Sequence, residues 1–287
     1  MRFATFSVDG TPGWGCVTPD GLVDMSRRLA PAFPDLKSYI TAGMPEAARF
    51  AAVAPDLPLS AVTLAPVIPN PAKIVMAAVN YFEPGEDRSA APAHPVLFLR
   101  LPSSQIGHGV PLIRPAVSEK LDFEGELAVI IGRPGRHIPR EAAMTYVAGY
   151  AIYNDGSVRD WQKHSHQFTA GKNFTGTGAF GPWMVTPDEF GLGTREISLV
   201  TRVNGIEKQS TTLDRMIFDV AHLISYISTF APLEAGDVIV TGTCRGFGST
   251  RVPPEFLQIG DVVQVAIDGI GVLENRVEAE ESGILAS

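Results

Sequence analysis

The chain has 287 residues, of which 45% are hydrophobic and 19% charged, and its formal net charge is −8. This length suffices for one large and one small domain with a sizeable buried core, and the acidic balance argues against nucleic acid or an anionic membrane as a partner. Cys16 and Cys244 are far apart in sequence, the N-terminus lacks a signal pattern and no apolar run reaches transmembrane length, so we expect a cytoplasmic protein without disulfides.

Residues 1–65 predict a small β-rich domain. Asp9-Gly10 and Asp20-Gly21 lie between alternating apolar residues, which is typical of β-hairpin turns. An alanine-rich stretch at 36–53 predicts a helix. The segment PVIPNPAK at 66–73 has three prolines in eight residues, and we interpret it as a linker.

Residues 70–280 predict a larger domain built mostly of strands. Short β-branched segments bounded by Gly, Pro or Asn favour a mixed or antiparallel β fold; they are 73–80, 95–101, 125–132, 147–154, 182–186 and 198–205. Apolar residues at helical spacing predict one amphipathic helix within 216–232. Gly-Asp turns precede β-branched strands at 234–240 and 258–265, which suggests a rolled, internally similar β-structure. The predicted class is α+β, mostly β.

Two glutamates in the segment LDFEGELAVIIG, 121–132, are candidate metal ligands. Glu124 and Glu126 point to one face of a strand, roughly 7 Å apart along it. A buried carboxylate is costly unless it is paired or bound to a metal, and Asp155, at the end of the next apolar strand, is the proposed third ligand. Three carboxylates suit Mg²⁺, Mn²⁺ or Ca²⁺. The alternative is an edge strand with solvated glutamates, and Asp122 is either a fourth carboxylate or a solvated neighbour.

The polar stretch after Asp155 contains candidate catalytic residues. Arg159 and Gln162 follow closely, and an arginine offers a forked contact to a substrate carboxylate. Lys172 is suited to stabilising a developing enolate or oxyanion. A loop with solvated charges is the alternative interpretation. His164 is a surface histidine on the simplest view, and a candidate for proton transfer because histidine titrates near neutral pH.

Gly176, Gly178 and Gly181 spell GxGxxG, the pattern of a dinucleotide-binding turn. No apolar strand leads into this stretch, and Pro182 follows where a helix should begin. We therefore expect these glycines to allow close backbone approach rather than to bind a nucleotide.

Taken together, the segments resemble the fumarylacetoacetate hydrolase family over about residues 70–280. The order and spacing of many matching pieces make the resemblance specific; the pieces are Asn80-Tyr81, 95–104, 122–132, 148–162, 171–174, 236–243 and 260–271. The first 65 residues resemble the family's small N-terminal domain more weakly. The resemblance implies a mixed β-roll catalytic domain, usually dimeric, that uses Mg²⁺, Mn²⁺ or Ca²⁺.

The resemblance also implies a role for individual residues. Glu124, Glu126 and Asp155 match the family's metal ligands. The family's substrate-contacting lysine matches Lys172, and its arginine, glutamine and TGT threonine match Arg159, Gln162 and Thr243. Two more residues in matching segments are expected substrate contacts, namely Tyr81 and Arg100.

Two departures from the family pattern concern the chemistry. Family members that hydrolyse or decarboxylate carry a His-x-x-Glu pair after the NY, and this chain has Pro84 and Asp87 at those positions. A base would have to come from Glu83, Glu86, Asp87 or His164. The TGT turn continues as Cys244-Arg245, and Arg245 either binds a second substrate carboxylate or is solvated.

The resemblance implies a divalent-metal hydrolase that cleaves a C–C bond in an acylpyruvate-like or 1,3-dioxo acid. The same site would also support an isomerase, a tautomerase or a decarboxylase of a 2-oxo acid. Pro84 in place of the family's histidine favours the isomerase or tautomerase. A non-catalytic metal- or metabolite-binding protein is the alternative from another class. We expect a small-molecule partner and a homodimer.

Overall fold

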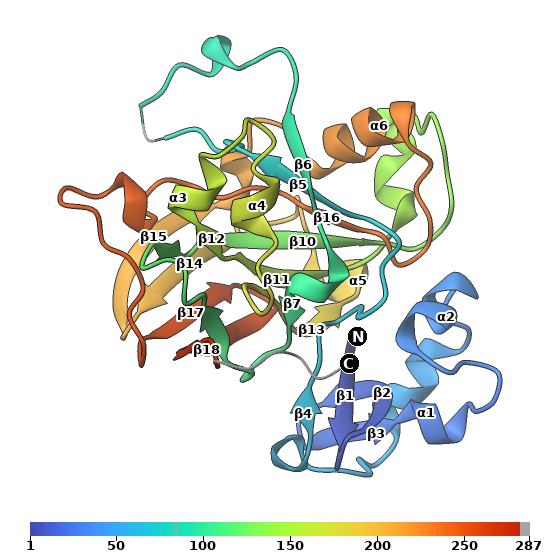
Figure 1. Cartoon of the computed structure of the whole chain (residues 1–287). Coiled ribbons are helices and arrows are strands. Elements are labelled where there is room, and N and C mark those ends of the chain that lie inside the picture. Colours follow the sequence, from blue (N-terminus) through green and yellow to red (C-terminus); the bar gives the residue numbers. More distant parts are fainter. Residues whose placement is uncertain (84, 282–287) are drawn as a thin grey trace.

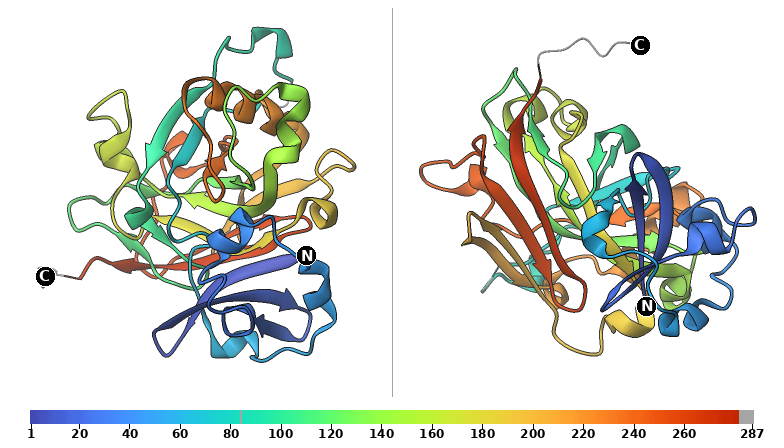
Figure 2. Two further views of the ribbon diagram at one scale, coloured as in Figure 1. Left: turned by 90° about the vertical axis from the view of Figure 1, so that its right-hand side faces the viewer. Right: turned by 90° about the horizontal axis from the view of Figure 1, so that it is seen from below.

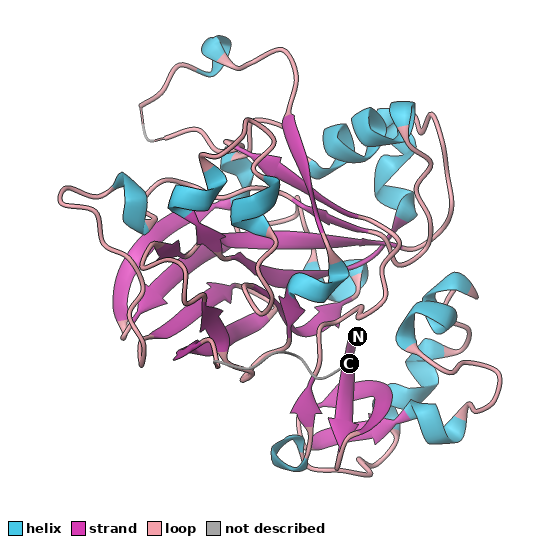
Figure 3. Ribbon diagram, in the orientation of Figure 1, coloured by secondary structure: helices cyan, strands magenta, loops and turns pink. Residues whose placement is uncertain are grey.

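The computed structural model describes residues 1–83 and 85–281, which form two large β-sheets, one two-stranded sheet and a set of short helices (Figures 1 and 3). The larger sheet has eleven strands: nine in the order β3-β2-β1-β13-β11-β10-β16-β5-β6, with β4 paired to β1 and β7 to β13. Their bounds are β1 Arg2–Val8, β2 Thr11–Thr18, β3 Gly21–Asp24, β4 Thr63–Leu64, β5 Ile74–Ala78, β6 Val96–Arg100, β7 Gln105–Ile106, β10 Gly125–Ile131, β11 Val147–Asp155, β13 Gly178–Val185 and β16 Val238–Val240.

The second sheet has five strands in the order β15-β14-β17-β18-β8, and β12 pairs with β9 separately. The bounds are β8 Leu112–Arg114, β9 Leu121–Asp122, β12 Ser157–Val158, β14 Ser198–Val203, β15 Ile206–Thr212, β17 Val262–Ile267 and β18 Gly271–Ala279. Most pairings are antiparallel, while β16 with β5, β7 with β13 and β8 with β18 are parallel. The predicted mixed, mostly β class is confirmed.

The helices are short, and α6, with 11 residues, packs on the larger sheet. The α-helices are α1 Met25–Arg28, α2 Leu36–Thr41, α3 Arg159–Gln162, α4 Thr169–Lys172, α5 Pro187–Phe190 and α6 Val220–Phe230. The 3₁₀ helices are η1 Ala47–Ala52, η2 Leu59–Ala61, η3 Arg88–Ala90, η4 Pro102–Ser104, η5 Arg140–Tyr146, η6 Leu213–Arg215 and η7 Gly248–Thr250. Within the described residues, no helix is both long and apolar enough to cross a membrane.

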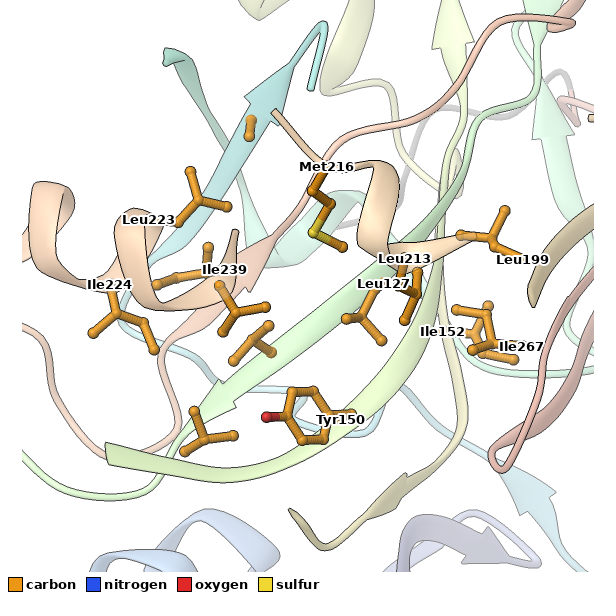
Figure 4. Packing of buried hydrophobic residues seen from close by; sticks show 14 of the residues in the cluster. Leu127, Tyr150, Ile152, Leu199, Leu213, Met216, Leu223, Ile224, Ile239 and Ile267 are labelled. Carbon is orange, nitrogen blue, oxygen red and sulfur yellow. The ribbon is translucent and has the colours of Figure 1, made fainter. Parts of the chain in front are cut away.

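The main hydrophobic core lies between the two sheets and under α6 (Figure 4). Leu127 and Ile152 from β10 and β11 face Leu199 and Ile267 from the second sheet, and α6 adds Ile224. Burying a side chain of this size contributes about 1.5–3 kcal/mol. The core therefore holds β10 and β11, the two strands that carry the candidate metal ligands, in a fixed register.

The strands of residues 1–65, the predicted small domain, continue the larger sheet, because β1 pairs with β13 (Figure 2). Phe3 and Trp14 from these strands share a second core with Ala128 of β10. Val67 and Ile68 of the expected linker are fully buried in that core. The segments expected as two domains, 1–65 and 70–280, therefore pack as neighbours through one sheet and one core.

Most predicted strands are confirmed, within a few residues of the expected bounds. At the first hairpin, Asp9 and Gly10 both have positive φ, as a two-residue type I′ turn requires. The predicted helix at 36–53 is confirmed only over Leu36–Thr41, and its continuation to 53 is wrong. Gly43 takes a left-handed conformation and Pro45 lacks a backbone N–H, so α2 ends at Thr41 and only the 3₁₀ helix η1 follows.

The predicted amphipathic helix exists as α6 but begins later than 216. Asp219 is its N-cap, and the Asp219 carboxylate accepts a hydrogen bond from the backbone N–H of His222 at 2.8 Å. The preceding residue, Phe218, is held by Asn80, whose side-chain oxygen accepts from the Phe218 N–H at 2.8 Å. This contact fixes the backbone just before Tyr81, at the wall of the cavity described below.

Candidate metal and substrate site

The three acidic residues picked out in the sequence meet on one face of the larger sheet; we call Glu124, Glu126 and Asp155 the carboxylate cluster. Gly125 pairs with Asn154 in the antiparallel ladder of β10 and β11. Next to this pair, the Asp155 N–H donates to the Glu124 carbonyl at 2.8 Å. Cross-strand neighbours and alternate residues of one strand share a face, so the ladder itself brings the three side chains together.

Three cationic side chains contact the carboxylate cluster. Lys172 Nζ lies 2.6 Å from Glu124 Oε2 and also donates to Asp155 Oδ2. Arg100 donates to Asp155 Oδ1, and Arg159 Nη2 lies 2.7 Å from Glu124 Oε1. Burial raises the pKa of Asp155, but Lys172 and Arg100 outweigh burial and hold it below its ordinary value. Asp155 is therefore a carboxylate near neutral pH.

Asp122 is not solvated, and it lies outside the carboxylate cluster. It is fully buried, and its Oδ2 accepts from Arg159 Nε at 2.7 Å. Its two oxygens also accept from the backbone N–H groups of Gly248 and Ser249, at 2.7 and 2.8 Å. Asp122 thus ties Arg159 to the 248–249 turn and positions the guanidinium beside Glu124.

The donor set fits a divalent cation. One oxygen from each member of the carboxylate cluster lies within 4.8 Å of the others, and all three residues are buried. Glu126 takes part in none of the ion pairs among the described residues, and its Oε2 accepts from the Gly242 N–H. Burial raises the pKa of Glu126 well above its ordinary value, and Asp155 and Glu124 raise it further. A hard cation bound by oxygen ligands would relieve this repulsion.

A cavity of about 310 Å³ opens above the cluster. Its walls are largely apolar, from Phe98, Phe168 and Phe247. It is also lined by most of the site residues predicted from the sequence, namely Tyr81, Glu124, Glu126, Arg159, Gln162, Lys172, Thr243 and Arg245. Polar groups that converge between apolar walls are typical of a small-molecule site.

The polar side chains of the cavity wall are held by specific contacts. Gln162 Oε1 accepts from Arg159 Nη1 at 2.9 Å. Thr243 Oγ1 donates to the Gly125 carbonyl at 2.9 Å and accepts from Gln209 Nε2 at 2.8 Å. The Tyr81 hydroxyl is buried without a hydrogen-bond partner among the described residues, and burial raises its pKa, so it stays a neutral phenol.

The mouth of the cavity is formed by Glu83, Glu86 and Arg245. The Arg245 N–H donates to Glu83 Oε1 at 3.0 Å, and its guanidinium lies 3.5 Å from Glu86 Oε1. Glu83 and Glu86 belong to the segment between β5 and β6, which projects from the body on the same side as α3 and α4 (Figure 1). Pro84, where the family has histidine, lies outside the described residues.

Three predicted site residues are not among those that line the cavity: Asp155, which belongs to the carboxylate cluster, and Arg100 and His164. Arg100 is fully buried behind Asp155, and its guanidinium also bonds the Gly156 carbonyl and Thr177 Oγ1. The expectation that it contacts substrate is therefore not supported; its place is to hold Asp155. His164 is exposed and packs on the Trp161 ring, outside the residues that line the cavity.

The glycine pattern at 176–181 does not form a nucleotide-binding turn. Gly178 and Gly181 lie in strand β13 rather than before a helix. A Cβ on Gly178 would lie 2.6 Å from the Tyr153 hydroxyl and 2.9 Å from Arg100 Nη2. Gly178 therefore leaves room for the side chain of Arg100, which supports Asp155 and packs closely against the glycine backbone.

Sequence reasoning missed two groups that shape the site. Gln209 accepts from the Gly125 N–H and donates to Thr243, which joins β10 to the 243 turn. A lone glutamine in a strand carries no pattern that marks this role. The aromatic wall comes from three separate segments; Phe98 lies in the matching segment 95–104 and Phe247 just beyond the TGT turn, but neither carried a pattern that marked it as cavity wall.

Comparison with known proteins gives a family match. The family model described as "Fumarylacetoacetate (FAA) hydrolase C-terminal" matches residues 73–278. Oxaloacetate tautomerase YisK of Bacillus subtilis (strain 168) is 40% identical over 225 residues, which are 76% of this chain and 74% of that protein.

Solved structures match over nearly the full length. Fumarylacetoacetate hydrolase (EaFAH) from psychrophilic Exiguobacterium antarcticum is 35% identical, with a TM-score of 0.84 over 98% of this chain and 100% of that chain. Maleylpyruvate hydrolase from Sphingobium sp. SYK-6, in complex with manganese(II) and pyruvate, is 27% identical, with a TM-score of 0.80 and the same coverage.

Proposed function

The chain belongs to the fumarylacetoacetate hydrolase family, and we propose that it is a divalent-metal-dependent tautomerase that interconverts the keto and enol forms of a small 2-oxo dicarboxylic acid. The relative named oxaloacetate tautomerase supports the reaction class. The single observation that carries the proposal is the cavity that places Lys172 beside the buried carboxylate cluster. A shared fold alone is weak evidence for a reaction, so the proposal depends on these side chains.

The metal is proposed to be Mg²⁺ or Mn²⁺, held by Glu124, Glu126 and Asp155. A divalent ion there would polarise the carbonyl of a 2-oxo acid and so acidify the adjacent C–H. The buried, unpaired Glu126 and the oxygen-only donor set support this assignment. The manganese in the Sphingobium structure supports it from a relative.

The chain's own residues supply the remaining interactions. Lys172 donates a hydrogen bond to the oxygen on which negative charge develops, and its ion pairs with Glu124 and Asp155 hold its Nζ beside the cluster. Arg159 contacts the substrate's 1-carboxylate and is oriented by Gln162, while Thr243 lines the cavity with its hydroxyl held between Gly125 and Gln209. The neutral Tyr81 hydroxyl gives one more donor to a bound oxygen. Arg245, at the mouth, is placed to meet the distal carboxylate.

The side chains that line the cavity favour tautomerisation over C–C hydrolysis. Among the described residues, none of those lining the cavity is a histidine. Hydrolysis of a C–C bond needs a base that activates water as well as an acid for the leaving carbon, whereas tautomerisation needs one proton carrier. A carboxylate at the mouth of the cavity, from Glu83 or Glu86, suffices as the single proton carrier of a tautomerase.

C–C hydrolysis of an acylpyruvate is the second candidate. The relative that binds manganese and pyruvate is named a maleylpyruvate hydrolase, and this observation favours it. The cavity would present the same carbonyl to the same lysine. The third candidate, a non-catalytic binding protein, predicts metal binding without turnover.

One experiment separates the three candidates. The protein with Mg²⁺ is given enol-oxaloacetate, and ketonisation is followed by absorbance against a metal-only blank; fumarylpyruvate and other acylpyruvates are tested for pyruvate release. We expect ketonisation well above the blank, no cleavage, and loss of the rate in Lys172→Met. Pyruvate release at a higher rate than ketonisation would replace the tautomerase with the hydrolase. Metal binding with neither reaction would leave the binding protein.

We further propose a homodimer in the cytoplasm. Val96, Leu99 and Leu101 are about half exposed along the edge strand β6 and its end, where a second copy would cover apolar surface. Cys16 and Cys244 are buried free thiols, in keeping with a reducing compartment. Light scattering after gel filtration tests the dimer, and a Leu99→Lys variant should run as a monomer.

A further inference from the structure

We propose that Glu83 is the general base of this site, the residue that carries a proton between C3 and the carbonyl oxygen of a bound 2-oxo acid. This inference rests on the tautomerase function proposed above. Glu83 lines the same cavity as Lys172 and Glu126, from the opposite, mouth side. A substrate lying between them would have its carbonyl toward the lysine and its C3 toward Glu83.

The backbone that leads to Glu83 is fixed on the protein body. Tyr81 forms an isolated antiparallel bridge with Met216. The Phe82 N–H donates to the Arg215 carbonyl at 3.0 Å, and Arg215 Nε donates to the Phe82 carbonyl at 3.0 Å. Glu83 therefore follows directly on an anchored stretch, and its side chain starts from a defined position. A general base has to be placed in this way to reach one particular hydrogen.

The Glu83 carboxylate is oriented through one oxygen only. Its Oε1 accepts from the Arg245 N–H at 3.0 Å, and no second donor among the described residues reaches the carboxylate. Glu86 Oε2 accepts from the Glu83 N–H at 2.9 Å, which closes a turn over the mouth. The half-buried carboxylate thus has an oriented oxygen and a second oxygen for proton transfer.

The other candidate bases are placed less well. Asp87 is exposed, is not among the residues lining the cavity, and accepts two hydrogen bonds from Ser89. His164 is exposed outside the lining. Glu86 is held by the Glu83 N–H and faces Arg245. Burial, followed by the charge of Glu83, raises the pKa of Cys244 to about 12, so this thiol stays protonated.

The proposed step balances without any further reactant. The C3–H bond breaks and the proton passes to a Glu83 oxygen, while the electron pair forms the C2=C3 bond and the carbonyl π pair moves onto the oxygen. Lys172 donates a hydrogen bond to that oxygen throughout. Protonated Glu83 then returns the proton to the oxygen, directly or through one water, so that ketone becomes enol. The reverse sequence gives ketonisation.

The test compares two neighbouring carboxylates on the same segment. Glu83→Gln keeps the shape and an oxygen that accepts from Arg245, and removes the base; Asp87→Asn makes the same chemical change outside the cavity. Ketonisation of enol-oxaloacetate is measured with saturating Mg²⁺, and Mn²⁺ binding is measured separately by electron paramagnetic resonance. We expect Glu83→Gln to lose about 10²–10⁴-fold in kcat with ion affinity within threefold of the wild type, and Asp87→Asn to keep its rate.

Three results would overturn the assignment while leaving the proposed function standing. They are a wild-type-like rate in Glu83→Gln, an equal loss in Asp87→Asn, or a loss in Glu83→Gln that follows a matching loss of Mn²⁺ affinity. Deuterium wash-in at C3 of 2-oxobutanoate gives a second readout of the same proton step, and it should fall in parallel. A wild-type protein with no rate above the Mg²⁺ blank would instead refute the tautomerase itself.

Discussion

The floor and the mouth of the cavity differ in how they are built. The floor, which is the carboxylate cluster, lies on two strands paired in the middle of the larger sheet, and its members are at most 7% exposed. The mouth, made by Glu83, Glu86 and Arg245, lies on two loops, with an ion pair at 3.5 Å between side chains that are 70% and 42% exposed. The fold therefore fixes the carboxylate cluster, while the proposed substrate choice and proton transfer depend on segments that can change without disturbing the sheet.

Because the floor is buried and the mouth is exposed, we expect the largest loss of stability when the buried arginine behind Asp155 is replaced. Arg100→Met keeps much of the side-chain volume but removes the guanidinium that bonds Asp155, Gly156 and Thr177. Breaking a buried ion pair from one side costs about 3–5 kcal/mol, because the other partner is left buried. We expect a fall of this size in the free energy of unfolding, measured by denaturant titration in the presence of chelator.

Arg202→Met is the matched control for that experiment. Arg202 pairs with Glu207 at 3.7 Å, and both side chains are largely exposed, 40% and 52%. Exposed pairs contribute about 0–1 kcal/mol. Similar losses in the two variants would show that Arg100 does not support the floor in the way its contacts suggest.

Glu126→Gln should separate ion binding from stability. Glutamine keeps the oxygen that accepts from Gly242, and replaces a buried acid whose ionised form is disfavoured by burial, Asp155 and Glu124. We expect Mn²⁺ affinity and activity to fall by more than about 100-fold, while the chelated protein is at least as stable as the wild type. Electron paramagnetic resonance and denaturant unfolding measure the two effects. The control is Glu278→Gln, an exposed glutamate on β18; full activity of Glu126→Gln after chelation would exclude the site.

Gly178→Ala should disturb the floor through packing alone. The added Cβ would lie 2.6 Å from the Tyr153 hydroxyl and 2.9 Å from Arg100 Nη2, so Arg100 has to move. Overpacking of this kind costs about 1–3 kcal/mol. Gly181→Ala on the same strand is the control, because its nearest contacts are ordinary ones of 3.4 Å. Equal melting temperatures for the two variants would contradict the close approach at Gly178.

The carboxylate cluster could be predicted from the sequence because its three residues lie on one strand and on the next strand along the chain. Alternation puts Glu124 and Glu126 on one face, and Asp155 ends the next strand, which here pairs directly with the first. Strand periodicity and a short connection suffice for such a prediction. The strands of the larger domain were found for the same reason, since each is a short β-branched segment with clear ends.

The rest of the site depends on contacts between residues far apart in sequence, which no local pattern records. Asp122 bonds Gly248 across 126 residues, and Arg245 meets Glu83 across 162. Arg100 was assigned to substrate because its segment matched, yet the fold turns it behind Asp155. The helix predicted at 36–53 is too long for a local reason: its alanine content favours a helix throughout, but Gly43 takes the left-handed conformation that ends one.

Arg245→Ala should have the smallest effect, and it tests whether the mouth selects substrate separately from the floor. The side chain is 70% exposed, so stability should change by less than about 1 kcal/mol. Alanine keeps the backbone N–H that holds Glu83, so the proton step for a monocarboxylate such as 2-oxobutanoate should be unaffected. For oxaloacetate, loss of the contact to the distal carboxylate should lower kcat/KM by about tenfold. Arg88→Ala, an exposed arginine on the same segment as Glu83, is the control. An equal loss on both substrates would mean that Arg245 acts by closing the mouth through Glu86, and not by binding the second acid.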